Sequence, residues 1–281
     1  MNKFNNNSGV TLIEILIGIV ISIIIMAAMF ASYTAINNSY SQVTDKAKAS
    51  QSGRNIMGMM IRDIRQAGFK YFEDTIANSD EPVRITKDKG GVNATVDSDC
   101  DHIRIVFGDV SYDASGDEVY ERYRLTYFCQ ESEIELPDGT NEETNAIYKQ
   151  KEKLDNSGDW QTNINGSYGP QLITDYIEDL IFVPKDINGK EIDPAPTNSE
   201  NEDRIYDIRS VEVALMTRSV KNFYKSDEQL DGSQRSIIGI ENDTNLMEDI
   251  SDRFLRETFV MSVSTRNIGL EWKIKKKKVL H

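Results

Sequence analysis

The chain has 281 residues, a length that allows one large domain or two small ones. It carries 32 lysine and arginine residues against 46 aspartate and glutamate residues, so its formal net charge is −14. Non-specific binding to nucleic acid needs a positive surface, and the acidic balance therefore argues against nucleic acid as a partner. The two cysteines fit an oxidising compartment, in which a single structural disulfide is common.

The first thirty residues hold the strongest signal in the sequence. Residues 15–31 are all apolar or small, and no charged residue follows until Asp45. A helix of this length spans a hydrocarbon core of about 30 Å. Glu14 stands at the start of the stretch, and an ionisable group in a membrane segment is costly and by default functional.

Two ordinary interpretations are a secretory signal peptide and a plain signal anchor. The apolar stretch is longer than the usual signal-peptide core of about 7–15 residues, and residues 26–28 provide only an ambiguous cleavage pattern. A plain anchor explains the length of the stretch but not the presence of Glu14.

Residues 9–14, G-V-T-L-I-E, resemble the type IV prepilin signature, in which a glycine precedes the scissile bond and a glutamate is fifth in the mature chain. The resemblance implies that a prepilin peptidase removes the leader, residues 1–9, by cutting between Gly9 and Val10. It also implies methylation of the new amine of Val10, a position where the family usually has phenylalanine. Glu14 would then neutralise the amine of an incoming subunit, because opposite charges attract strongly in apolar surroundings and an unpaired buried charge is expensive.

The apolar helix is expected to continue beyond the membrane. No proline interrupts residues 10–81, and Gly68 is a natural stop. We expect residues 10–36 to form a transmembrane or filament-core helix, residues 37–68 its amphipathic continuation, and residues 69–281 a β-rich head domain. The continuation has an apolar stripe at spacings of three and four, made of Ile56, Met57, Met60, Ile61, Ile64 and Ala67.

The two cysteines flank a predicted hairpin. Residues 102–107 and 119–128 form its expected strands, and residues 112–117 carry turn chemistry. Pairing of these strands brings Cys100 near Cys129, which favours a disulfide. Two free buried thiols are the alternative.

The register of this hairpin presents a conflict. A centre near Ala114 opposes the two cysteines but sets Ile103 against Thr126. A shift by one residue matches Ile103 to Leu125 and separates the sulfurs. One β-bulge would reconcile the two arrangements.

The remainder of the chain alternates short periodic segments with polar turns. The order of one long helix followed by strands predicts an α+β fold, with an antiparallel sheet packed against the second half of the helix. Strands are expected at residues 83–86, 92–96, 146–149, 208–220 and 259–266, helices at residues 172–180 and 246–255, and long polar loops at residues 136–144 and 193–203.

Short segments along the chain resemble the PilW family of large minor pilins. They lie at residues 53–54, 61–69, 176–182, 211–219 and 265–267. The resemblance implies the type IV pilin fold and a structural subunit of the priming or tip complex of a type IV pilus, present in few copies. Its expected partners are other minor pilins, the major pilin, the prepilin peptidase and the inner-membrane assembly platform.

The same resemblance implies a location and leaves two alternatives. The chain would cross the bacterial inner membrane once with a periplasmic head, and would then move to the pilus at the cell surface. Large minor pseudopilins of type II secretion share this layout and are one alternative. A binding or adhesion module at the pilus tip is the other.

The sequence shows no catalytic constellation, so we expect no enzyme. Its only histidines are His102, in a predicted strand, and His281. No glycine-rich phosphate loop, H-E-x-x-H or C-x-x-C metal motif occurs. A lysine-rich run at residues 273–278 is typical of a solvated tail, although such a run also suits anionic lipid, DNA or an acidic partner.

One segment carries a metal hypothesis, and otherwise no cofactor is expected. Oxygen-bearing side chains at Asp186, Asn188, Glu191 and Asp193 surround the turn-forming Gly189, as a Ca²⁺ ion requires. The EF-hand spacing and its terminal bidentate glutamate are missing. Ordinary hairpin-turn chemistry accounts for the same residues.

Overall fold

The structure is a computed structural model. It describes residues 10–69, 81–87, 100–135, 139, 144–192, 202–220, 223, 237–238, 245–247 and 253–268. The chain divides into two compact units, Met1–Ala47 and Lys48–His281, and each is described by itself. The predicted leader, the predicted strand at residues 92–96 and the lysine-rich run at residues 273–278 lie outside the described residues.

Helix α1 spans Leu12–Gln66 and is long and apolar enough, by length and composition, to cross a membrane. In the first unit its large apolar side chains are exposed. Ser22 is the only hydroxyl of the apolar stretch, and its Oγ donates to the carbonyl of Gly18 at 2.7 Å. The hydroxyl is therefore satisfied within the helix, as a lipid environment demands.

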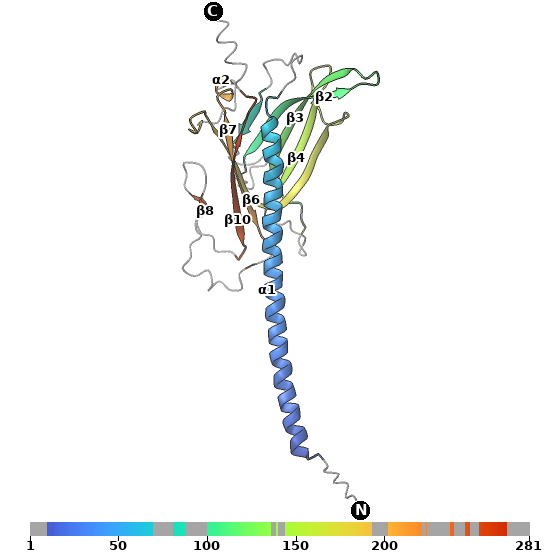
Figure 1. Cartoon of the computed structure of the whole chain (residues 1–281), viewed down its shortest axis with the longest axis vertical. Coiled ribbons are helices and arrows are strands. Elements are labelled where there is room, and N and C mark those ends of the chain that lie inside the picture. Colours follow the sequence, from blue (N-terminus) through green and yellow to red (C-terminus); the bar gives the residue numbers. More distant parts are fainter. Residues whose placement is uncertain are drawn as a thin grey trace, which may run out of the picture. The chain divides into compact units, whose positions relative to one another are not determined.

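An antiparallel sheet forms the body of the second unit (Figure 1). Its strand order is β1-β2-β3-β4-β6-β7-β10, with β5 paired to β4. The strands are β1 (Val83–Thr86), β2 (His102–Tyr112), β3 (Glu118–Glu131), β4 (Asn145–Leu154), β5 (Trp160–Gln161), β6 (Tyr168–Lys185), β7 (Ser210–Arg218) and β10 (Arg256–Ser264). A separate pair joins β8 (Ile237–Ile238) to β9 (Asn245–Met247), and a short helix α2 spans Glu202–Ile205.

The apolar stripe of α1 faces the core of the second unit. Five of its six predicted members are buried there, and Ile61 packs on the core from its edge. The stripe packs against alternate side chains of the strands, since successive residues of a strand point to opposite faces of a sheet. These partners include Ile103, Ile105, Leu125, Tyr127, Leu180, Phe182, Val213 and Leu215. The predicted α+β fold is therefore confirmed.

The hairpin between β2 and β3 pairs in a register that differs from both predicted ones. Ile103 lies opposite Tyr127 and Ile105 lies opposite Leu125, so buried residues match each other without a bulge. The bulge prediction is wrong. Cys100 lies two residues before the start of β2, so it is not part of the β2–β3 ladder. It is bonded to Cys129, which lies in β3.

Both predicted short helices are wrong. Residues 172–180 belong to β6, and β9 occupies residues 245–247 where a helix was expected to begin. In β6 the pairing with β7 shifts register between Ile177 and Asp179, and Tyr176 has a positive φ of 62°. The irregular strand buries Ile177 and Leu180 three residues apart, a spacing that imitates a helix.

Three hairpin turns share one local design. They occupy residues 113–117, 155–159 and 186–190, and each has aspartate first and glycine fourth. In each turn one carboxylate oxygen of the aspartate accepts backbone N–H groups from the third and fifth residues, at 2.8–3.0 Å. The glycines have φ of 85°, 88° and 75°, the left-handed conformation that three-residue hairpin loops require at this position.

Candidate functional site

The candidate site is the N-terminal end of helix α1. The helix begins at Leu12, so Thr11 is its N-cap and Glu14 occupies the third helical position. A carboxylate oxygen of Glu14 accepts the backbone N–H and the hydroxyl of Thr11, each at 2.8 Å, and the Glu14 N–H donates to the Thr11 hydroxyl at 3.4 Å. This reciprocal pair is a capping box.

The capping box provides a second role for Glu14 that the sequence analysis missed. A threonine followed three residues later by glutamate before an apolar run is a local signature of a helix start. Both bonds from Thr11 reach the same carboxylate oxygen. An ionised carboxylate has about four lone-pair sites, so the cap leaves acceptor capacity and the negative charge available.

The predicted cleavage point lies immediately before this site. Gly9 is outside the described residues, and Val10 is 73% exposed. Cleavage before Val10 would leave a new amine one residue from the N-cap. The carboxylate that caps the helix and the predicted new amine therefore belong to one short segment.

The two cysteines lie in the second unit and are joined by a disulfide. Their Cα atoms are 6.0 Å apart, within the usual range for such a bond. The bridge ties the segment before β2 to β3. Nearby, the ring of His102 meets Phe128 edge-on with centroids 6.0 Å apart, which is a packing contact.

The segment with the metal hypothesis is one of the three aspartate turns. The carboxylate of Asp186 accepts the N–H groups of Asn188 and Lys190, and the bond from Lys190 lowers the pKa of that carboxyl. The backbone of Glu191 pairs with that of Lys185 in an isolated antiparallel β-bridge. Asp193 is outside the described residues. Within the described ranges no group of three or more histidine, cysteine or acidic residues is arranged to hold a metal. The calcium site stays a prediction.

Residues 4–30 match the family model described as the prokaryotic N-terminal methylation motif. The predicted prepilin signal is confirmed. In fold, the chain is similar to the "Type IV-like pilin TTHA1219 from Thermus thermophilus", with a TM-score of 0.48 and 10% sequence identity over 78% of this chain and 95% of that chain. No curated protein matches the chain. The assignment to the PilW family stays a prediction.

Proposed function

We propose that the chain is a minor pilin, a non-enzymatic structural subunit of the priming or tip complex of a type IV pilus. The observation that carries the proposal is Glu14, an acidic residue at the start of an otherwise apolar helix, inside a match to the N-terminal methylation motif. Residues 10–36 hold the subunit in the inner membrane before assembly, and its head lies in the periplasm.

Maturation creates the partner of Glu14. The prepilin peptidase cuts between Gly9 and Val10, and the amine of Val10 is then methylated. In an assembling filament the Glu14 carboxylate of one subunit receives the Val10 amine of the next. Such a pair at 4 Å is worth about 1 kcal/mol in water and about 4 kcal/mol at an effective dielectric constant of 20, so the contact is strongest among packed apolar helices.

The second unit supports this function by holding its part of α1 on the sheet. Asp63 on α1 accepts the hydroxyl of Tyr127 on β3 and pairs with Lys149 on β4 at 2.7 Å. With the apolar stripe, these contacts connect the helix to two central strands. The head therefore moves together with the helix when other minor pilins, the major pilin and the assembly platform bind the helix.

Two substitutions separate the charge of Glu14 from its capping role. Glu14→Gln retains an acceptor for the Thr11 N–H and removes the charge, whereas Glu14→Ala removes both. We expect both variants to be cleaved before Val10 and both to fall at least tenfold in sheared filaments, measured by immunoblot and N-terminal sequencing. Wild-type incorporation of Glu14→Gln would show that capping alone matters, and the proposal would be wrong.

Deletion of the gene distinguishes the pilus from a secretion system. We expect the deletion strain to lose most surface pili, counted by electron microscopy, and to export proteins normally. Normal piliation with blocked protein export would assign the chain to the minor pseudopilins. Normal piliation combined with lost surface attachment would instead favour an adhesion module at the tip.

A further inference from the structure

A cavity of about 310 Å³ lies at the C-terminal end of helix α1, within the second unit. Its volume is at the lower end of the range of about 300–1,000 Å³ that is typical of small-molecule sites. The walls come from the end of α1, from strand β2 and from the residues that follow β10. Six side chains line the cavity: Arg65, Gln66, Phe69, Phe107, Asp109 and Asn267.

Hydrogen bonds between these segments hold the walls in place. The Gly108 N–H donates to the Phe69 carbonyl at 2.7 Å, which fixes the chain after α1 to strand β2. The side-chain amide of Asn267 donates to the Arg65 carbonyl at 3.3 Å, which fixes the segment after β10 to the end of the helix. The cavity is therefore formed by the fold itself and needs no ligand to create it.

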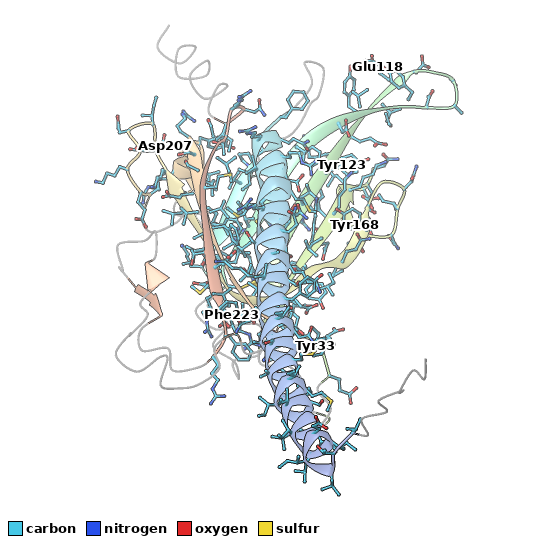
Figure 2. The ribbon with its side chains drawn as sticks, turned by 60° about the horizontal axis from the view of Figure 1, so that its bottom comes forward. Tyr33, Glu118, Tyr123, Tyr168, Asp207 and Phe223 are labelled. Carbon is cyan, nitrogen blue, oxygen red and sulfur yellow. A yellow bond between two sulfur atoms is a disulfide. The ribbon has the colours of Figure 1, made fainter. Side chains whose placement is uncertain are left out.

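Two phenyl rings give the cavity an apolar part. Phe107 is only 8% exposed, and its ring packs against the ring of Tyr123 with centroids 5.9 Å apart. Tyr123 belongs to the core cluster that includes the apolar stripe of α1 (Figure 2). The second ring belongs to Phe69, which is 40% exposed. An apolar group of a ligand would remove part of this surface from water, which favours binding.

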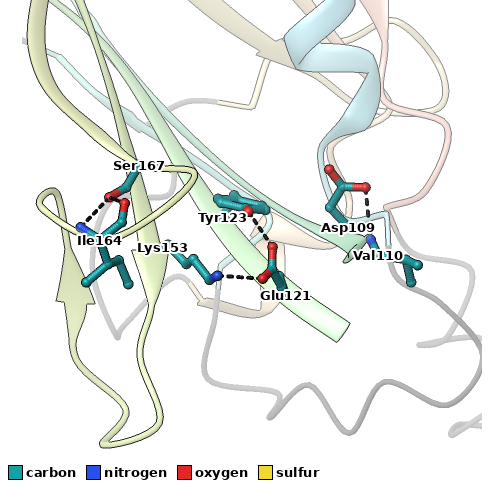
Figure 3. Close-up of polar contacts among 7 residues, drawn as sticks. All are labelled: Asp109, Val110, Glu121, Tyr123, Lys153, Ile164 and Ser167. Atoms are coloured by element: carbon teal, nitrogen blue, oxygen red, sulfur yellow. Dashed lines mark hydrogen bonds and ion pairs between the residues drawn. The ribbon is translucent and has the colours of Figure 1, made fainter. Parts of the chain in front are cut away.

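Four polar side chains line the same cavity and have unused bonding capacity. The Arg65 guanidinium and the Gln66 amide form no hydrogen bond with any described residue. One carboxylate oxygen of Asp109 accepts the Val110 N–H at 2.9 Å (Figure 3), and its other oxygen accepts no bond from the described residues. The side-chain oxygen of Asn267 likewise has no donor in the described part of the chain. A few polar groups that converge on an apolar cavity are typical of a ligand site.

Two of these side chains carry opposite charges that do not meet. Arg65 and Asp109 line one cavity, yet they form no ion pair within 4.0 Å of each other. The ammonium group of the neighbouring Lys151 lies 3.7 Å from the centroid of the Tyr123 ring and forms no ion pair with a described carboxylate. A molecule that carries both a carboxylate and an ammonium group can pair with both charges of the cavity at once.

We propose that the cavity binds a free α-amino acid with an apolar side chain. The ligand carboxylate accepts hydrogen bonds from Arg65, whose planar guanidinium matches the geometry of a carboxylate. The ligand ammonium group donates to Asp109 and to the side-chain oxygen of Asn267. The apolar side chain of the ligand lies against the two phenyl rings. The inference concerns the second unit alone and does not rest on the proposed function.

The requirement for both charges selects a free amino acid over the end of a peptide. A peptide bond removes one of the two charges from a terminal residue, so that residue would leave either Arg65 or Asp109 without its partner. Charge-assisted hydrogen bonds are roughly twice as strong as neutral ones, so the loss of either contact should weaken binding measurably.

Equilibrium dialysis of the full chain in detergent tests the site, with radiolabelled L-phenylalanine as the probe. After subtraction of uptake by micelles alone, we expect saturable binding with a Kd below about 1 mM. Phenylpropionate lacks the ammonium group and phenethylamine lacks the carboxylate, so each should compete at least tenfold less well than L-phenylalanine. Absence of saturable binding, or equal competition by all three compounds, would overturn the proposal.

Two substitutions that remove one charge each test the assigned contacts. Arg65→Gln should weaken L-phenylalanine binding at least fivefold and leave phenethylamine binding unchanged, because phenethylamine has no carboxylate. Asp109→Asn retains an acceptor for the Val110 N–H. It should weaken L-phenylalanine binding at least fivefold and leave phenylpropionate binding unchanged. Arg54→Gln on the same helix and Asp117→Asn in the same hairpin lie outside the cavity and should bind like the wild type.

Other results would contradict the proposal. Both substituted positions of the cavity are exposed, so all four variants should melt like the wild type. Equal weakening in the two variants outside the cavity would show a general effect of surface charge. Competition by glycyl-phenylalanine or phenylalanyl-glycine as strong as that by free L-phenylalanine would show a site for peptide ends.

Discussion

Gly53 of helix α1 lies directly against the ring of Phe259 on strand β10. A Cβ at this position would lie 2.6 Å from Cζ and 2.7 Å from Cδ2 of the Phe259 ring, and closer still to Cε2. Gly58, five residues farther along the same helix, has no atom within 4 Å of an added Cβ. The two glycines therefore offer a matched pair for testing helix–sheet packing.

Gly53→Ala should destabilise the second unit by about 1–3 kcal/mol, because the Phe259 ring, which is partly buried and packs against the core, must shift to make room for the added methyl group. Gly58→Ala should stabilise it by up to about 1 kcal/mol, because alanine favours a helix over glycine and meets no neighbour. Urea denaturation of both variants in detergent, followed by tryptophan fluorescence, measures the difference. Equal effects of the two substitutions would contradict the close packing.

The aspartates of the hairpin turns should make stability depend on acid. A backbone bond from Asp159 holds the pKa of the Asp155 carboxyl below its ordinary value of 3.8, and a bond from Lys190 does the same for Asp186. A lowered folded-state pKa means that the stabilisation is complete above the ordinary value and is lost as pH falls through the folded-state value.

The Tm of the wild type should therefore exceed that of Asp155→Ala with Asp186→Ala at pH 6. The difference in Tm between the two proteins should become smaller as pH falls from about 4 toward 2. Melting curves at several pH values check this, with Asp207→Ala, outside these turns, as the control. A gap that stays constant down to pH 2 would mean that the ionised carboxylates contribute nothing.

At the scale of the elements, the disulfide cross-links the segment before β2 to strand β3. The bond between Cys100 and Cys129 closes a loop with a sequence separation of 29 residues. The chain-entropy model assigns such a loop roughly 3–4 kcal/mol, because the link restricts the unfolded chain. The disulfide also joins β3 to the short segment at residues 100–101, which comes directly after residues 88–99 outside the described part.

Cys100→Ser with Cys129→Ser should lower the free energy of unfolding by about 2–4 kcal/mol. The wild type, unfolded without reductant, should bind no iodoacetamide, and after reduction it should bind two molecules, as counted by mass spectrometry. Labelling of two thiols in the unreduced protein would show that the bond does not form in the cell.

At the scale of the whole molecule, the two units differ in whether their apolar side chains are exposed or buried. The exposed apolar side chains of the first unit contrast with the buried stripe of α1 in the second. We expect the wild-type chain to stay in the membrane pellet after alkaline carbonate extraction. Detergent should release it.

Ile21→Arg with Ile24→Arg should move the chain to the carbonate-soluble fraction. Each arginine at the centre of a membrane helix costs about 2.5–3.5 kcal/mol on the insertion scale. Asn37→Arg with Asn38→Arg adds the same charge beyond the apolar stretch and should leave the chain in the pellet. Pelleting of all three proteins would show that the apolar stretch does not hold the chain in the membrane.

The sequence by itself determined the features that depend on one continuous segment. The prepilin signal at Glu14 and the apolar stripe from Ile56 to Ala67 were predictable because their residues are neighbours on one helix. The capping partner Thr11 was predictable for the same reason, although only the structure drew attention to it.

Only the tertiary structure decided the features that depend on pairing between distant segments. The partners of Asp63 lie 64 and 86 residues away, and the sequence around Asp63 gives no sign of them. Strand β6 carries helix-like spacing because its register shifts against β7, and the β2–β3 register follows from matching core residues across two strands. Such features are set by which segments meet in the sheet, and local periodicity does not contain that information.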